Sequence, residues 1–234
     1  MGNQERNGSK ANPTAEDRKG AGHGQMARTD GLRMLFPTLI YVAWYTDYEA
    51  VRDRIIAFNL KLRQDDEAGR NLSGQKYATG FTSYFSRNDL YRSDELKSLV
   101  TFLQRSAFAY ASEHHWDVEN YTPVINTLWG NINSRYSFHA EHLHPYSHIS
   151  GVFYVDTPPG SPAISFKDPR VARWMMPPAA DGTRPENTFH ASIAPESGKL
   201  LLFPSWLELG VGQNQEDVER ISMSFNFEMR PKQA

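Results

Sequence analysis

The sequence predicts a mostly β protein with N-terminal helices, folded as a β-sandwich or jelly roll. Two observations lead to this prediction. Apolar residues at helical spacing occur early in the chain, between residues 47 and 115. From Tyr121 onward, short segments of strand length alternate with turn residues such as Pro158-Pro159-Gly160 and Glu196-Ser197-Gly198. Helices followed by many short strands favour a rolled sheet that the helices brace.

Composition narrows the class of protein. The chain has 234 residues, of which 39% are apolar, and a formal charge of −2. This charge suggests neither a nucleic acid nor a membrane surface as a partner. No apolar run approaches the roughly 20 residues that cross a bilayer, and the N-terminus has no apolar segment of the kind found in signal peptides. The absence of cysteine excludes disulfides and thiolate ligands, and we expect a cytoplasmic protein.

The chain is expected to form one domain behind a tail. Residues 1–30 contain no Leu, Ile, Val or aromatic residue, so they cannot bury enough apolar surface to offset the entropy of ordering. We therefore expect a disordered tail over residues 1–31 and a single domain over residues 32–234.

The elements follow in chain order. A strand is expected over 35–45, and the apolar spacing from Val51 to Leu62 predicts a helix over 47–66. The polar, glycine-containing segment 69–80 is expected to be a loop. A second helix is expected to begin after Ser93 and to end near residues 114–115, because its apolar residues form one stripe. Further strands are expected over 122–132, 150–155, 163–166, 189–193, 199–206 and 220–227.

Histidines cluster at the start of one predicted strand. Four of the eight histidines, His139, His142, His144 and His148, lie within ten residues and precede an apolar run. His142 and His144 have the i, i+2 spacing that places two side chains on the same face of a strand. Neutral imidazole suits iron, copper, nickel and zinc, so the cluster indicates a metal site.

The last predicted strand, residues 220–227, alternates strictly. Its apolar residues face one way, and Arg220, Ser222, Ser224 and Asn226 face the other. In an ordinary sandwich the polar face meets water. In a jelly roll that binds an acid inside, the same face holds a carboxylate with the arginine and the serine hydroxyl.

Several segments match a known family in consistent order over about residues 35–227. They are LFPT (35–38), WGNIN (129–133), HLHP (142–145), SGVFYV (150–155), ISFKDPR (164–170), GKLLLFPSWL (198–207) and ERISMSFN (219–226). The chain resembles the Fe(II)- and 2-oxoglutarate-dependent oxygenase superfamily, and more narrowly a bacterial and phage branch of 2OG-Fe(II) oxygenases. SGVFYV, FPSWL and RISMSFN together make the resemblance fairly specific.

The resemblance implies a double-stranded β-helix that holds Fe(II) and 2-oxoglutarate. In this superfamily an early-strand histidine and its i+2 partner bind iron, which places His142 and His144 at the metal. An Arg-x-Ser pair on a late strand binds the far carboxylate of the co-substrate, which corresponds to Arg220 and Ser222. Tyr154 is a candidate for a further hydrogen bond to the co-substrate.

Two positions depart from the pattern of the superfamily. His144 stands where a carboxylate is usual, and Leu209 stands where the distal histidine ligand is expected. Leucine cannot coordinate a metal ion. Glu141 and Glu208 are the nearby residues that would substitute as ligands if the chain turned them inward.

The resemblance implies an oxygenase that hydroxylates a C–H bond of a small molecule and whose activity Leu209 impairs. The alternative is a catalytically silent jelly-roll module that binds a ligand or a partner through the former active-site cavity. A cupin with the HxH pair is a weaker third reading, because no residue fits the histidine of the second cupin motif. Trp129, Trp174 and Trp206 are candidates for the wall of a substrate pocket.

Overall fold

The computed structural model describes residues 34–76, 79–176, 178–179, 181–182, 184 and 187–232. The tail predicted over residues 1–31 lies outside this described part. The chain divides into two units, Met1–Pro37 and Thr38–Ala234, and the fold is that of the second unit. None of the helices in the described residues combines the length and the hydropathy of a membrane-spanning segment.

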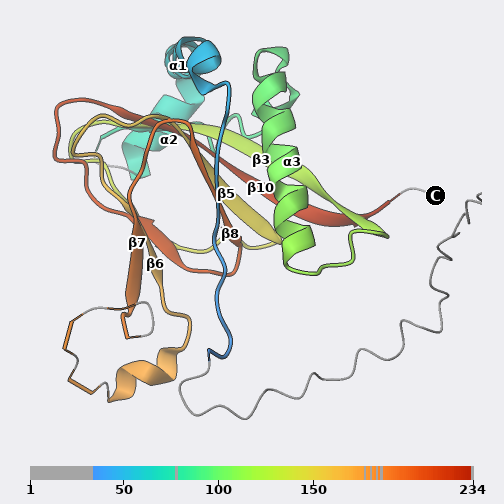
Figure 1. Ribbon diagram of the computed structural model, residues 1–234. Helices are drawn as coiled ribbons and strands as arrows, with labels where there is room; N and C mark the ends of the chain where they lie inside the picture. Colours follow the sequence, from blue (N-terminus) through green and yellow to red (C-terminus); the bar gives the residue numbers. More distant parts are fainter. Residues whose placement is uncertain are drawn as a thin grey trace, which may run out of the picture. The chain divides into compact units, whose positions relative to one another are not determined.

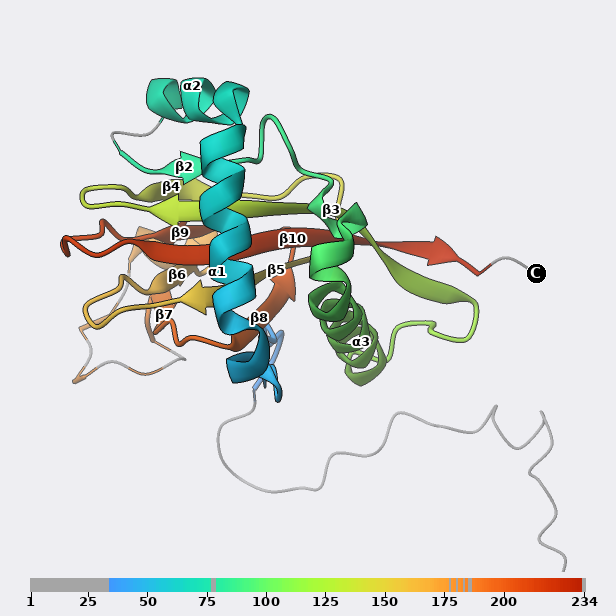
Figure 2. The same cartoon turned by 90° about the horizontal axis from the view of Figure 1, so that it is seen from above.

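Two antiparallel sheets form the body of this unit (Figures 1 and 2). The major sheet has six strands in the order β1-β8-β5-β10-β3-β2, and the minor sheet has four in the order β4-β9-β6-β7. The major strands are β1 (Tyr41–Trp44), β2 (Phe81–Thr82), β3 (Tyr121–Asn133), β5 (Ile149–Asp156), β8 (Lys199–Pro204) and β10 (Arg220–Pro231). The minor strands are β4 (His139–His142), β6 (Ile164–Lys167), β7 (His190–Ile193) and β9 (Leu209–Val211). The mostly β, jelly-roll prediction is confirmed.

Helices cover one face of the major sheet, as Figure 2 shows for α1 (Tyr48–Asp65) and α3 (Lys97–Glu113). The apolar stripe of α3 predicted from the sequence is buried, and Leu99 and Leu103 have no exposed surface. They belong to one core cluster with Phe153 of β5 and Phe225 of β10. The remaining short helices are α2 (Glu67–Lys76), η2 (Leu90–Arg92), η3 (Asp94–Leu96) and η4 (Val171–Met175).

The other face of the major sheet packs against the minor sheet. A second core cluster joins Val152 and Phe203 of the major sheet to Ile164, Phe166 and Leu209 of the minor sheet. Successive residues of β5 and β8 therefore alternate between two buried faces, because a strand in the middle layer has no face toward water.

The polar face of strand β10 is buried. Arg220 and Ser222 are each 2% exposed and Asn226 is 6% exposed, so the polar face points between the sheets rather than to solvent. The solvent-facing alternative is therefore wrong for this strand, whereas binding of a carboxylate by this face stays a prediction. The cause is the minor sheet, which covers the polar face of β10 while the helices cover its apolar face.

The prediction of a loop over residues 69–80 is wrong for most of this segment, because Glu67–Lys76 forms α2. The segment has no apolar stripe, and tertiary contacts hold it instead. The Asp66 carboxylate accepts a hydrogen bond from the backbone N–H of Gly69 at 2.9 Å. The Ser73 hydroxyl accepts the backbone N–H of Thr82 at 2.9 Å, which ties the helix to β2.

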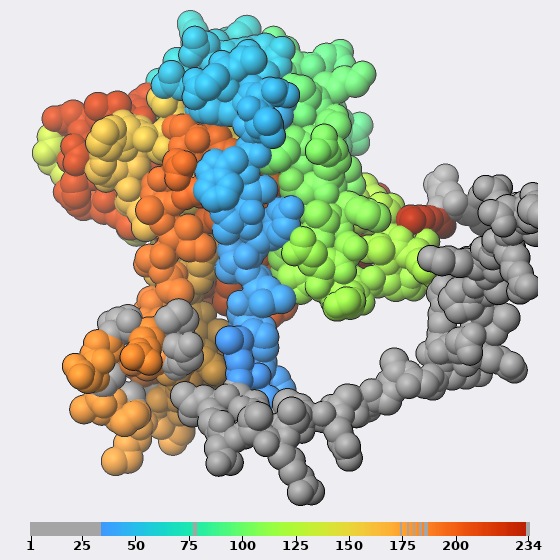
Figure 3. All heavy atoms as spheres, viewed as in Figure 1, coloured from blue at the N-terminus to red at the C-terminus, as the bar shows by residue number. Residues whose placement is uncertain are grey.

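Strand β1 ends the major sheet through its pairing with β8. Figure 3 shows β1, in blue, at the surface beside the orange of β8. Trp44 of this strand is 52% exposed, and its indole N–H donates to Glu196 at 3.2 Å. This edge strand covers the outer edge of β8.

Candidate functional site

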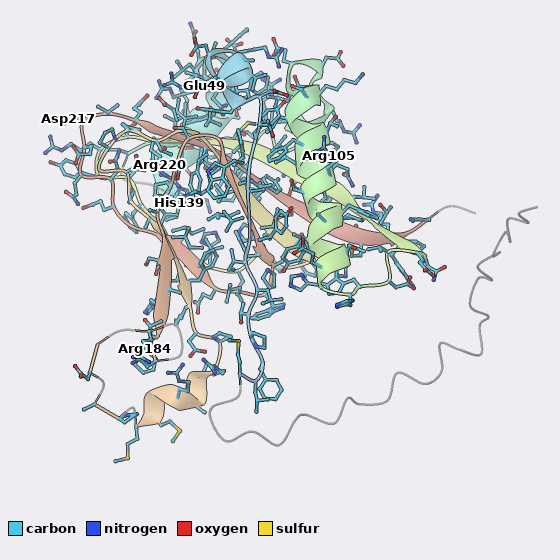
Figure 4. All side chains as sticks on the ribbon, viewed as in Figure 1. Glu49, Arg105, His139, Arg184, Asp217 and Arg220 are labelled. Atoms are coloured by element: carbon cyan, nitrogen blue, oxygen red, sulfur yellow. The ribbon has the colours of Figure 1, made fainter. Side chains whose placement is uncertain are left out.

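A cavity of about 480 Å³ lies between the two sheets. The major sheet contributes Arg220 and Ser222 of β10, and the minor sheet contributes His139 and His142 of β4 and Leu209 of β9. Figure 4 labels Arg220 and His139, which lie together among the strands. The volume falls in the range of small-molecule sites.

Arg220 is the buried charge of this cavity. Its Nη1 donates to Asn133 Oδ1 at 3.1 Å and to Ser222 Oγ at 3.4 Å. Among the described residues no carboxylate forms an ion pair with Arg220. Burial lowers the pKa of the guanidinium from its ordinary value, but arginine stays protonated in proteins. A buried cation without a counter-ion is costly, and an anion bound in the cavity would relieve this cost.

Two buried polar atoms of this group also lack well-aligned partners. Arg220 Nε and the Tyr154 hydroxyl have no well-aligned hydrogen-bond partner among the described residues, and the polar contact recorded at both groups is the one between these two side chains. The Arg220 guanidinium carbon lies 5.1 Å from the centre of the Tyr154 ring, and Tyr154 has no exposed surface. Burial raises the pKa of the Tyr154 phenol, so the hydroxyl keeps its proton as a donor. The three predicted acid-binding residues, Arg220, Ser222 and Tyr154, thus lie side by side.

Asn133, which the sequence analysis did not single out, orients this end of the cavity. Its Oδ1 accepts from Arg220, so its Nδ2 points the other way, toward Ser137 Oγ at 2.8 Å and His139 Nε2 at 3.1 Å. Because an amide nitrogen only donates, His139 Nε2 must accept and carries no proton. The signal in the sequence was the WGNIN segment, whose last residue pairs with Arg220 in the β3–β10 register.

His139 is held neutral by its surroundings. Burial, followed by the Arg220 guanidinium and His142, lowers the pKa of His139 to about 3. A protonated ring here would place a second positive charge beside Arg220 in a site already desolvated. This end of the cavity therefore presents one fixed positive charge surrounded by neutral polar groups.

His142 and His144 face each other in the same cavity, with ring centroids 5.0 Å apart. His142 Nδ1 donates to the carbonyl of Ala140 at 2.8 Å, so Nε2 is the ring nitrogen of His142 that is placed to bind a metal ion. Burial, and then the neighbouring His142, lowers the pKa of His144 to about 4, so the His144 ring is neutral. Two imidazoles on one metal ion have centroids about 4.5 to 5.5 Å apart, for metal–nitrogen bonds of about 2.1 Å. The spacing of the pair is thus suited to one ion.

Leu209 occupies the position where the resemblance implies the third metal ligand. It pairs with His142 across the β4–β9 ladder, is 4% exposed and lines the same cavity. No group of three or more metal-ligating side chains is placed to share an ion within the described residues. The position that the resemblance assigns to a distal histidine therefore contributes a hydrocarbon side chain.

The two candidate substitutes, Glu141 and Glu208, have other partners. Glu141 accepts from Lys167 Nζ at 2.8 Å and from His190 Nε2 at 2.9 Å, and these contacts lower the pKa of its carboxyl. Glu208 lies 3.0 Å from the same Lys167 ammonium. Both carboxylates are thus engaged in one ion-pair cluster with Lys167, and Glu141 lines the same cavity as His142 and His144.

The remaining candidates are distributed as follows. Trp129 lines the cavity, and Trp206 is 57% exposed and does not. The side chain of Trp174 lies outside the described part of the structure. His148 accepts the backbone N–H of Met229 at 3.2 Å, and it is not part of the cavity wall.

The donor set fits an organic acid better than it fits a metal ion. Arg220 brings a buried positive charge and an Nε without a well-aligned partner to the cavity wall, with the Ser222 hydroxyl beside it, while Tyr154 lies next to Arg220 but outside the cavity wall. For iron, the chain offers two imidazoles and no third ligand among the described residues. A facial site with three protein ligands is therefore incomplete.

Residues 127–226 match the family model described as "Putative 2OG-Fe(II) oxygenase". This segment, 100 of the 234 residues, belongs to the 2OG-Fe(II) oxygenase family. The matched segment contains every residue of the acid-binding and histidine groups described above. In a comparison with curated protein sequences, none matches this chain.

Solved structures of similar fold include a hydroxylase, an epimerase and a protein crystallised with 2-oxoglutarate. A Pseudomonas putida prolyl-4-hydroxylase has 14% identity and a TM-score of 0.55 over 82% of this chain and 94% of its own. The α-ketoglutarate-dependent epimerase SnoN from nogalamycin biosynthesis has 12% identity and a TM-score of 0.58, covering 81% and 77%. HygX from Streptomyces hygroscopicus, solved with nickel, 2-oxoglutarate and hygromycin B, has 12% identity and a TM-score of 0.52, covering 82% and 83%. At these identities the likeness establishes the fold of the double-stranded β-helix.

Proposed function

We propose that this 2OG-Fe(II) oxygenase-family protein binds 2-oxoglutarate, or a closely similar 2-oxo dicarboxylic acid, through Arg220. The observation that carries the proposal is the buried guanidinium with an Nε that lacks a well-aligned partner and no counter-carboxylate among the described residues. An incoming carboxylate supplies the missing negative charge and accepts the free N–H groups. Charge-assisted pairs of this kind are the strong hydrogen bonds of protein interiors.

The chain's own groups have distinct parts in this binding. Arg220 and Ser222 hold the far carboxylate, and the Tyr154 hydroxyl donates a further hydrogen bond to it. Asn133 fixes the direction of the guanidinium through its Oδ1. The two sheets enclose the acid and exclude bulk water, which strengthens each of these contacts.

Calorimetric titration with 2-oxoglutarate in the presence of a metal chelator tests the proposal. The wild-type chain is expected to bind the acid, and Arg220→Met to weaken binding by roughly 10- to 100-fold, the effect of losing hydrogen bonds to a charged group. Arg105→Met is the matched control, since Arg105 is an exposed arginine of α3 outside the cavity wall. Absence of binding, or equal affinity in the Arg220 and Arg105 variants, refutes the proposal.

A second function, oxygenase activity on a small-molecule substrate, is favoured by the geometry of His142 and His144. Their rings, with centroids 5.0 Å apart, provide two of three expected ligands for Fe(II). A bound iron would supply the activation of dioxygen, and the keto acid would be oxidised to succinate. With Leu209 in place of the third ligand, we expect iron to be held weakly and turnover to be low.

The substitution Leu209→His separates this function from that of a silent acid-binding module. An oxygenase with a decayed ligand set should gain the visible absorption of an iron-chelated keto acid under anaerobic conditions, and should then form succinate in air. Val211→His is the control, because it adds a histidine to the same strand and cavity but opposite His139 rather than His142. If neither the absorption nor succinate appears in the Leu209 variant, the silent module is the better description.

A further inference from the structure

The cavity has a second, aromatic end that the acid-binding residues do not use. Trp129, Tyr84 and Phe85 line it, with ring centroids 4.8 Å apart for Tyr84–Trp129 and 5.0 Å for Tyr84–Phe85. Trp129 is 6% exposed, whereas Tyr84 and Phe85 keep 39% and 43% of their surfaces open. A run of rings from the buried interior to the surface presents both faces and edges to a flat ligand.

The aromatic end lies too far from Arg220 for one short acid to occupy both. Arg220 pairs with Asn133 and Ser224 pairs with Trp129 in the β3–β10 register. Four residues along a strand span about 13 Å. The five-carbon chain of 2-oxoglutarate is about 6 Å long, given C–C bonds of about 1.5 Å. An acid anchored at Arg220 therefore leaves the Trp129 end free.

The turn that carries Tyr84 and Phe85 is held in place. The Ser83 N–H donates to Gly130 O at 3.0 Å, and the Gly130 N–H donates back to Ser83 Oγ at 3.2 Å. The Ser86 hydroxyl donates to the Asp66 carboxylate at 2.6 Å. The aromatic rings are thus fixed beside β3 before any ligand arrives, which lowers the entropy lost on binding.

The aromatic end adjoins the two histidines. Trp129 stacks on His144 at 5.9 Å with an interplanar angle of 29°. A ring bound against Trp129 and Tyr84 would therefore sit next to the place where His142 and His144 converge. At the rim, the Lys76 ammonium lies 4.6 Å from the centre of the Phe85 ring, so positive charge at both ends of the cavity disfavours a cationic ligand.

We propose that the aromatic end formed by Trp129, Tyr84 and Phe85 binds an uncharged, ring-bearing part of the substrate beside the histidine pair. The acid at Arg220 and the ring at Trp129 occupy the cavity together. The simultaneous arrangement rests on the function proposed above, whereas the ring site itself does not depend on it.

Two small neutral probes of matched size, phenol and cyclohexanol, test the ring site on the full chain. The indole N–H signal of Trp129, assigned by its loss in Trp129→Phe, reports binding in NMR titrations. Phenol is expected to shift this signal in a saturable way and to bind about fivefold more tightly than cyclohexanol, the gain from one aromatic contact. Phe85→Ala should weaken phenol binding about fivefold. Phe108→Ala should leave it unchanged, since Phe108 is equally exposed (42%) but lies on α3 outside the cavity.

Repeating the titration with 2-oxoglutarate present separates the two proposals. Phenol affinity is expected to stay the same when the acid is saturating, because the two ligands occupy different ends. Equal binding of phenol and cyclohexanol, equal effects of Phe85→Ala and Phe108→Ala, or displacement of phenol by the acid would each overturn the inference. If the acid fails to bind while phenol behaves as expected, the function proposed for Arg220 falls and the ring site stands.

Discussion

Acid should destabilise this protein because two histidines of the cavity are held neutral in the folded state. The pKa of His139 is lowered to about 3 and that of His144 to about 4, both chiefly by burial, from an ordinary value of 6.5. The unfolded chain therefore takes up protons at higher pH than the folded chain does. Stability from these rings is fully present above about pH 6.5, and it is lost as the pH falls toward 4 and then 3.

The size of the effect follows from these values. At pH 5 an unfolded histidine with a pKa of 6.5 is almost fully protonated, whereas both folded rings remain neutral. Each ring then lowers the logarithm of the folding equilibrium constant by about 1.4 between pH 7 and pH 5, which is about 2 kcal/mol in the free energy of unfolding. The two rings together give a loss on the order of 3 to 4 kcal/mol, a large part of the stability of an ordinary domain.

Urea unfolding at pH 7, 6 and 5, at constant ionic strength and with a chelator present, measures this loss. Carboxylates with lowered pKa add to it in every variant, so the comparison between variants isolates the histidine. His139→Asn is expected to remove about half of the pH-dependent loss. His115→Asn is the control, since His115 is an exposed histidine at positive φ, a conformation that asparagine adopts readily. If His139→Asn and the wild type lose the same free energy of unfolding between pH 7 and pH 5, His139 is not held neutral by the fold.

Three further substitutions have definite expected outcomes. Arg220→Met should raise the free energy of unfolding by about 1 to 3 kcal/mol in urea titrations while weakening acid binding, because it removes a buried, uncompensated charge. Gly151→Ala should lower stability by about 3 kcal/mol or more, since a Cβ there would lie 2.7 Å from the backbone oxygen of Leu201 and would also contact the Phe225 ring; a change under 1 kcal/mol would contradict this. Tyr110→Phe should be neutral or stabilising by up to about 1 kcal/mol, because the Tyr110 hydroxyl is buried and has no partner among the described residues. A clearly lower melting temperature of Tyr110→Phe than of the wild type would contradict this prediction.

Local pattern was sufficient for some elements of the fold and insufficient for others. The apolar stripe from Leu96 to Ala107 predicted α3, because one face of that helix packs on the sheet and the pattern records it. The segment of α2 has no such stripe, because its contacts come from Asp66 and Ser73 rather than from an apolar face. Strands β4 and β9 were also not predicted, since each is short and is stabilised by hydrogen bonds to the other rather than by a local sequence pattern.

The site was predictable only where one residue carries its chemistry alone. His142, His144 and Arg220 were predicted from spacing and resemblance, and the structure places all three in one cavity, although β4 ends at His142 and His144 follows the strand; their roles stay a prediction. Asn133 was missed because its role depends on the β3–β10 register, which no local pattern contains. The alternation of β10 predicted a strand but not the environment of its polar face, because that depends on the sheet packed against it.

The division of the cavity between two sheets explains how Leu209 is compatible with an intact acid site. Arg220, Ser222 and Tyr154 come from the major sheet, whereas His142 and Leu209 come from the minor sheet. Leu209 packs in the core cluster that joins the two sheets, so a leucine at this ligand position adds apolar contacts where a histidine would add a polar ring. Leu209 therefore supports the packing between the sheets, while the orientation of Arg220 depends on Asn133 of β3. Under the proposed function, the acid is held by the major sheet and Leu209 removes a ligand only from the minor sheet, so a chain can lose metal binding and retain acid binding.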